Sequence, residues 1–145
     1  MAPSVERAEG AYLVLEDGTQ LLDANAGGSS FAVLGFSHPD VLEAMRAQMT
    51  RYCHVDFNSW ANPLTEELAA LILSRAPEGL SRVYFAGGSG SEAVEAAMKL
   101  SYQVHYDNGR PERTWTISRN QSYHGATLGS LMASELNTLG FYEPL

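Results

Sequence analysis

The glycine- and serine-rich stretch at residues 87–91 constrains the fold more than any other part of the sequence. It lies within YFAGGSGSEAVEAAMKL, residues 84–100, between a short apolar run and a segment with helical spacing of alanine and leucine. A strand that stops at such a turn and starts a helix leaves backbone N–H groups unpaired at the positive end of the helix dipole. This arrangement binds anions, most often phosphate. The sequence therefore predicts a strand, an anion-binding loop and a helix, in that order.

Turn and helix signals organise the first half of the chain. An Asp-Gly pair at residues 17–18 separates two apolar runs, which predicts a β-hairpin over residues 12–24. After a glycine- and serine-rich segment, a helix is predicted from Pro39, and its apolar face is expected to pack in a core. The Asn-Pro pair at residues 62–63 indicates the start of a second helix.

Strands and helices alternate in the second half. Short apolar strands are predicted at residues 82–86 and 114–118, on either side of a helix over residues 92–106. A loop and a further helix follow residue 119. This alternation predicts an α/β layer with parallel strands, whose ligands bind at the carboxyl ends of the strands. Both unusual loops, GGSGS and QSYHG, follow predicted strands and are expected to lie at that edge.

Composition and charge restrict the kinds of partner and site that the chain can have. The formal net charge is −8 with no basic cluster, which disfavours nucleic acid and anionic membranes as partners. The single cysteine, Cys53, excludes an internal disulfide and is expected to be a buried thiol in a reducing compartment. The histidines are scattered without ligand spacing, so no metal site is expected. No apolar stretch approaches the ~20 residues of a membrane span, and we expect a cytoplasmic protein that acts on small molecules.

Several known motifs compete for the glycine- and serine-rich loop. A Walker loop needs a lysine after its last glycine, and a nucleophile elbow needs a glycine two places after its serine; neither is present. The dinucleotide fingerprint G-x-G-x-x-A is satisfied by residues 88–93. Arg119, at the end of the next predicted strand, would suit a 2′-phosphate, so an NADP-binding oxidoreductase domain stays open.

The joint pattern resembles the class III aminotransferases, fold-type I enzymes that use pyridoxal 5′-phosphate (PLP). The resemblance rests on FAGGSGSEAVEAAMKL, on YHG about thirty residues later, and on YLVLEDGTQLLDANAGGSSFAVLGFSHPDVLEAM, so it covers nearly the whole chain. It implies the α/β fold of PLP-dependent transferases, with an N-terminal segment at residues 1–60 and the beginning of the large parallel-sheet domain at residues 61–145. It also implies transamination between an amine or amino acid and a 2-oxo acid, by a homodimer or larger homo-oligomer.

The resemblance also assigns site residues. The Ser-Gly-Ser loop would bind the cofactor phosphate, and the tyrosine of the YHG motif would stack on the pyridine ring, which suits an electron-poor flat ring. The histidine would help to hold the ring or loop, and the glycine would allow a close backbone approach. The implied cofactor residues are Ser89, Gly90, Ser91, Tyr123, His124 and Gly125, and the substrate-side candidates are Ser29, Ser30, Phe31 and Trp60.

The catalytic lysine is missing from this pattern. PLP catalysis requires a Schiff-base lysine and an acid opposite the pyridine nitrogen. The only lysine, Lys99, lies eight residues beyond Ser91, about 12 Å along the helix at 1.5 Å per residue. It shares an outer face with Glu95, a favourable i,i+4 pair. We therefore expect a surface lysine, no catalytic residue in this chain, and an N-terminal portion that is inactive alone; a non-catalytic phosphate- or nucleotide-binding module is the alternative.

Overall fold

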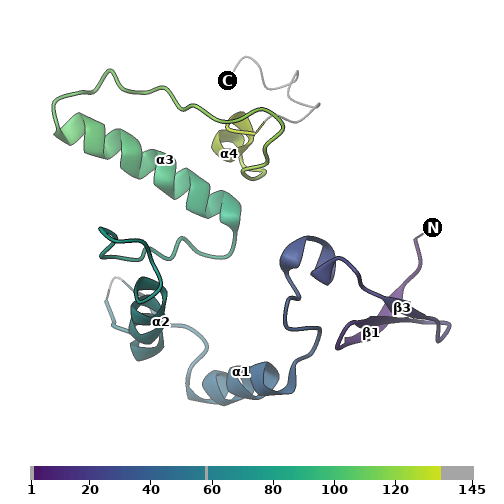
Figure 1. Ribbon diagram of the computed structural model, residues 1–145. Coiled ribbons are helices and arrows are strands. Elements are labelled where there is room, and N and C mark those ends of the chain that lie inside the picture. Colours follow the sequence, from purple (N-terminus) through teal and green to yellow (C-terminus); the bar gives the residue numbers. More distant parts are fainter. Residues whose placement is uncertain (1, 58, 135–145) are drawn as a thin grey trace. The chain divides into compact units, whose positions relative to one another are not determined.

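The computed structural model describes residues 2–57 and 59–134, apart from the side chain of Ser29 (Figure 1). The chain forms two compact units, Met1–Leu64 and Thr65–Leu145. The functional division expected from the sequence, into residues 1–60 and 61–145, stays a prediction. Among the described residues, no helix combines the length and the apolar character needed to cross a membrane.

An antiparallel sheet opens the first unit. Its strands lie in chain order: β1 (Val5–Glu9), β2 (Tyr12–Leu15) and β3 (Gln20–Leu22). The predicted hairpin is confirmed by β2 and β3, and in its turn the Asp17 carboxylate accepts the Thr19 N–H at 2.9 Å. This hydrogen bond lowers the pKa of Asp17. β1 lies outside the predicted hairpin, because its sequence VERAE lacks the apolar alternation that indicates a strand.

The glycine-rich segment after β3 is tied back to the sheet. It contains one π-helical turn, η1 (Ala26–Ser30), and ends beside the turn between β1 and β2. There Gly10 and Phe36 exchange backbone N–H to O hydrogen bonds of 3.0 and 2.7 Å. Gly35 has a φ of +83°, and a Cβ at this position would lie 2.9 Å from the Gly10 carbonyl oxygen. Only glycine fits at this crossing, which holds the segment that carries Ser29, Ser30 and Phe31 against the sheet.

Two helices follow, α1 (Pro39–Arg51) and α2 (Pro63–Leu73). The predicted start signal at residues 62–63 is confirmed. Asn62 Oδ1 accepts the Leu64 N–H at 3.0 Å and the Tyr52 hydroxyl at 3.1 Å. The same oxygen therefore satisfies the first turn of α2 and anchors the residue that follows α1.

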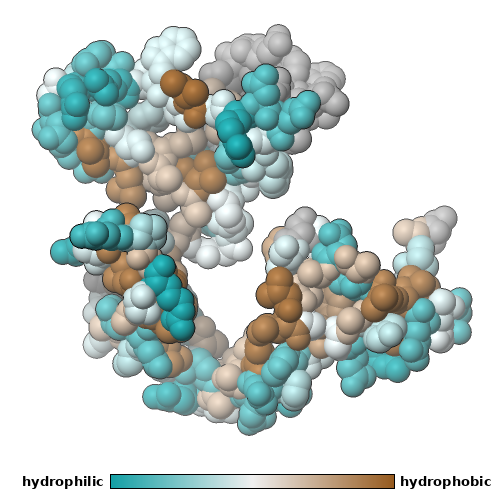
Figure 2. All heavy atoms as spheres, viewed as in Figure 1, coloured by the Kyte–Doolittle hydropathy of each residue, from teal (hydrophilic) through white to brown (hydrophobic). Residues whose placement is uncertain are grey.

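The apolar face of α1 is not packed in a core, contrary to the prediction. Met45 and Met49 are 56% and 65% exposed, and Figure 2 shows hydrophobic side chains at the surface of both units. Cys53 is exposed as well, so the predicted buried thiol is wrong. An amphipathic helix buries its apolar face only when another element covers it, and no described residue of this unit does so.

The second unit contains α3 (Gly90–Asp107) and α4 (Leu128–Met132). Both helices were predicted, but the strands predicted at residues 82–86 and 114–118 are not formed. A strand exists through hydrogen bonds to a neighbour, and the described residues provide none for these segments. Trp115 and Ile117 are accordingly 93% and 95% exposed. The apolar pattern is present in the sequence, whereas the sheet that would use it is not complete within the described residues.

Replacing Asn62 with alanine is expected to lower the free energy of unfolding by about 1 kcal/mol, because α2 loses the side chain that caps its first turn. Asn62→Asp is the matched control, since an aspartate retains the oxygen acceptor and is an equally good cap. Urea unfolding followed by far-ultraviolet circular dichroism compares the three proteins. Equal stability of the alanine variant and the unmodified protein would contradict a capping role.

Candidate functional site

The loop before α3 is fixed by a capping arrangement of Ser89 and Glu92. Ser89 Oγ accepts the Glu92 N–H at 3.2 Å, while Glu92 Oε2 accepts the Gly88 N–H and the Ser89 hydroxyl, both at 3.0 Å. Ser89 is the N-cap residue, and Glu92 is the third residue of the helix. The S-x-x-E signature could have identified Glu92 from the sequence, although the carboxylate accepts the N–H of Gly88, one residue before the N-cap, and not the N–H of Ser89 itself.

The amides of Gly90 and Ser91 follow the cap directly. The Glu92 carboxylate accepts hydrogen bonds from the Gly88 N–H and the Ser89 hydroxyl. The backbone N–H groups of Gly90 and Ser91 have no acceptor among the described residues. These are the first two positions of an 18-residue helix, where the dipole favours an anion. The predicted anion-binding geometry is therefore present at these two amides.

The YHG segment lies against this loop. Ala126 donates its N–H to Ser91 Oγ at 3.0 Å, across 35 residues of sequence. The His124 N–H binds Ser134 Oγ at 2.8 Å, and Ser134 is buried. Tyr123 is 65% exposed, so its ring is available for contact with a ligand. Both loops were expected at the carboxyl edge of a parallel sheet; the structure does not form that sheet, but it does bring the two loops together.

Gly125 marks the closest approach of the two loops. It is buried and has a φ of +133°. A Cβ there would lie 2.6 Å from Ser91 Oγ and would also collide with Ser130 Oγ. Both the backbone conformation and the available space therefore require glycine.

A carboxylate of α3 forms a second connection to this segment. Glu95 Oε1 accepts the Gly129 N–H at 2.9 Å, and the Thr127 side chain also hydrogen-bonds to Glu95. The Thr127 bond is the main reason that the pKa of Glu95 lies below its ordinary value, and the charge of Lys99 contributes least. The sequence predicted an outer face with a Glu95–Lys99 pair; instead, Glu95 faces α4, while Lys99 is exposed as predicted.

The substrate-side candidates lie in the first unit. Ser30 has a positive φ of 65°, and Phe31 and Trp60 are 86% and 69% exposed. The side chain of Ser29 lies outside the described structure. Their assignment to a substrate site stays a prediction, as do the cofactor roles of the residues in the second unit.

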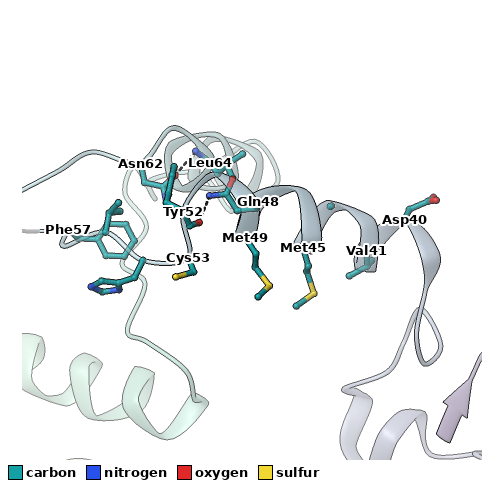
Figure 3. Close-up of a pocket in the computed structure, with 13 residues that line it drawn as sticks. Asp40, Val41, Met45, Gln48, Met49, Tyr52, Cys53, Phe57, Asn62 and Leu64 are labelled. Carbon is teal, nitrogen blue, oxygen red and sulfur yellow. Dashed lines mark hydrogen bonds between the residues drawn. The ribbon is translucent and has the colours of Figure 1, made fainter.

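A hollow of the first unit runs along α1. It has a volume of about 680 Å³, and Figure 3 shows Val41, Met45 and Met49 projecting from one face of the helix. Two polar lining groups serve the local structure: Gln48 Nε2 donates to the Tyr52 carbonyl at 3.1 Å, and Asn62 caps α2. This hollow is uncovered apolar surface and differs from the polar loops of the second unit.

Comparisons with known proteins agree with the geometry of these loops. An omega transaminase from Pseudomonas jessenii, solved in complex with PMP, superposes with a TM-score of 0.92 at 32% identity, covering 99% of this chain and 32% of that one. The adenosylmethionine-8-amino-7-oxononanoate aminotransferase from Methanocaldococcus jannaschii gives a TM-score of 0.89 at 30% identity, with coverages of 99% and 33%. Over the part that it covers, the chain thus has the α/β fold of the fold-type I transaminases.

Sequence comparison identifies the family. The aminotransferase class-III model matches residues 1–139, and the chain belongs to the class-III aminotransferase family. An uncharacterized aminotransferase of Schizosaccharomyces pombe is 43% identical over 129 residues, which are 89% of this chain and 28% of that protein. The adenosylmethionine-8-amino-7-oxononanoate aminotransferase of Nitratidesulfovibrio vulgaris is 37% identical, over 97% of this chain and 26% of its own length. The chain spans about a quarter to a third of these relatives, and none of them supports the dinucleotide-binding alternative.

Gly125→Ala is expected to separate the YHG segment from the start of α3 and to cost about 2 kcal/mol or more of stability, since a Cβ meets Ser91 and Ser130 at an unfavourable φ. Gly109→Ala is the matched control: Gly109 also has a positive φ, +70°, but its Cβ would meet nothing within 4 Å. Alanine there should cost only about 1 kcal/mol. Thermal unfolding of both variants measures the difference, and equal losses would show that the close approach is unimportant.

A pH dependence follows from Glu95. Its pKa is lowered in the folded chain from an ordinary value of 4.5, so its contribution to stability is present above that value and is lost as the pH falls through the folded pKa. Below about pH 4.5, we expect the melting temperature of Glu95→Gln to fall less steeply than that of the unmodified protein. The difference between variant and unmodified protein is the quantity to measure, because Asp17 and other carboxyls contribute to both. Identical pH profiles would contradict a stabilising role for the ionised carboxylate.

Proposed function

We propose that the complete protein catalyses PLP-dependent transamination and that this chain supplies its phosphate cup and ring-stacking residue. The observation that carries the proposal is the hydrogen bond from the Ala126 N–H to Ser91 Oγ, in a chain of the class-III aminotransferase family. It brings an anion-binding loop and an exposed aromatic side chain together from distant parts of the sequence. A bound PLP would supply an electron sink for chemistry at the amino-bearing carbon of the substrate.

The residues of the second unit fit the phosphate of PLP. The amides of Gly90 and Ser91 would donate to phosphate oxygens at the positive end of α3. Ser91 Oγ accepts the Ala126 N–H and keeps its own hydrogen for a phosphate oxygen, because a hydroxyl both accepts and donates. Ser89 Oγ is already engaged as donor and acceptor with Glu92, so Ser89 contributes through its backbone and its cap.

The pyridine ring would lie against Tyr123. The exposed tyrosine presents a face for offset stacking, a contact worth about 0.5–1.5 kcal/mol beyond area burial. His124 holds the segment through its backbone N–H, and Gly125 allows the close approach to Ser91. In this proposal the two residues shape the ring site rather than take part in proton transfer.

The covalent chemistry needs a lysine other than Lys99. Lys99 is exposed and lies two turns into α3, away from the helix start where the phosphate would bind. We infer that the covalent lysine and the acid for the pyridine nitrogen lie on further residues of the protein or on a companion chain. The substrates would be an amine or amino acid and a 2-oxo acid. Assembly as a cytoplasmic homodimer, with Ser29, Ser30, Phe31 and Trp60 on the substrate side, belongs to the same proposal.

The test is an absorbance spectrum of the complete protein with PLP, recorded before and after an amino donor, followed by borohydride reduction and peptide mapping. We expect a donor-sensitive band and a label on a lysine other than Lys99. Lys99→Met is the matched control and should leave band and label unchanged. A label on Lys99 would overturn the assignment of that residue, and the lack of any PLP-dependent band would overturn the proposed function.

A further inference from the structure

Two side chains of α3, one turn apart, bind the segment that carries Tyr123. Ser91 Oγ accepts the Ala126 N–H at 3.0 Å, and Glu95 Oε1 accepts the Gly129 N–H at 2.9 Å. Residues four apart on a helix lie on one face, so both contacts point in the same direction. Ser91 belongs to the proposed phosphate cup, whereas Glu95 was assigned no role in the site from the sequence.

The start of α4 provides both space and hydrogen-bond donors for the Glu95 carboxylate. A Cβ on Gly129 would lie 2.6 Å from Glu95 Oε2, so the absence of a side chain at that position makes room for the carboxylate. The Thr127 side chain adds a second hydrogen bond to the same carboxylate. An ionised carboxylate only accepts hydrogen bonds, and bonds to a charged acceptor are about twice as strong as neutral ones.

Two hydrogen bonds and the backbone of α4 connect this carboxylate to the residue next to Tyr123. Glu95 holds Gly129 at the start of α4, and the same short helix leads to the buried Ser134. Ser134 Oγ accepts the N–H of His124, the residue next to Tyr123. A shift of α4 away from α3 would therefore move the backbone that sets the position of the tyrosine ring.

We propose that Glu95 is a positioning residue for the ring of the cofactor, acting through α4 and Tyr123; this inference rests on the proposed PLP site. Among the described residues, the hydrogen bonds of the Glu95 side chain go to the start of α4 and not to the phosphate loop. Loss of Glu95 should therefore weaken the binding of PLP, which uses both phosphate and ring, and leave the binding of inorganic phosphate, which uses the loop alone, unchanged.

The experiment measures the dissociation constants of PLP and of inorganic phosphate for the complete protein and for Glu95→Gln, Tyr123→Leu and the double variant. We expect each single substitution to weaken PLP binding about fivefold, within the range of one stacking contact. The double variant should be no weaker than the weaker single variant, because both substitutions remove the same contact. Phosphate affinity should change less than twofold throughout.

Controls separate the possible outcomes. Asp107→Asn removes one negative charge from the far end of α3 and should bind PLP normally. If Glu95→Gln does not fold, Glu95→Asp, which keeps the charge but shortens its reach, takes its place and should show a smaller loss. Unchanged PLP affinity in Glu95→Gln, additive losses in the double variant, or an equal loss of phosphate binding would each overturn the inference. Failure of the unmodified protein to bind PLP would instead overturn the proposed function.

Discussion

The start of α3 sets the arrangement of the second unit. Its first turn presents the amides of Gly90 and Ser91, which have no acceptor within residues 2–57 and 59–134, and the Ser91 side chain accepts the N–H of Ala126. Ser91 therefore contributes its backbone N–H to the loop and binds the YHG segment through its hydroxyl. The buried Gly125 depends on this contact, since any side chain there would collide with Ser91. The Ser89 cap, the close approach of Gly125 and the amides of Gly90 and Ser91 all lie at the same helix end, because the first N–H groups of a helix have no partner within it.

In the proposed site, Glu92 and an incoming phosphate would share this helix end without using the same donors. The carboxylate takes the Gly88 N–H and the Ser89 hydroxyl, and both are satisfied when no ligand is bound. The amides of Gly90 and Ser91 are left for the ligand. A loop rich in glycine would otherwise lose much conformational entropy on ordering, so a cap that fixes the loop in advance reduces the cost of binding.

Local signals in the sequence predicted more of this structure than long-range ones. The Asp-Gly turn, the Asn62 cap and the limits of α3 depend on neighbours within about four residues. The first two were predicted correctly, and the predicted helix over residues 92–106 lies within α3, Gly90–Asp107. The strands at residues 82–86 and 114–118 and the burial of Cys53 depend on partners from elsewhere, which the described residues do not supply. Glu95 was misread because helical spacing shows which residues share a face but not what that face meets.

In the proposed function, cofactor binding and covalent chemistry are separated along the sequence of the protein. Every residue proposed for the phosphate and the ring lies at the start of α3 or in the YHG segment. Two side chains of α3, Ser91 and Glu95, accept hydrogen bonds from Ala126 and Gly129, which follow that segment. The only lysine is directed to solvent from the middle of the same helix. A site of this kind can orient a phosphate and an aromatic ring, but it has no lysine placed to form a Schiff base with the cofactor. The geometry of the cup therefore does not require the catalytic lysine, and the two can be tested independently.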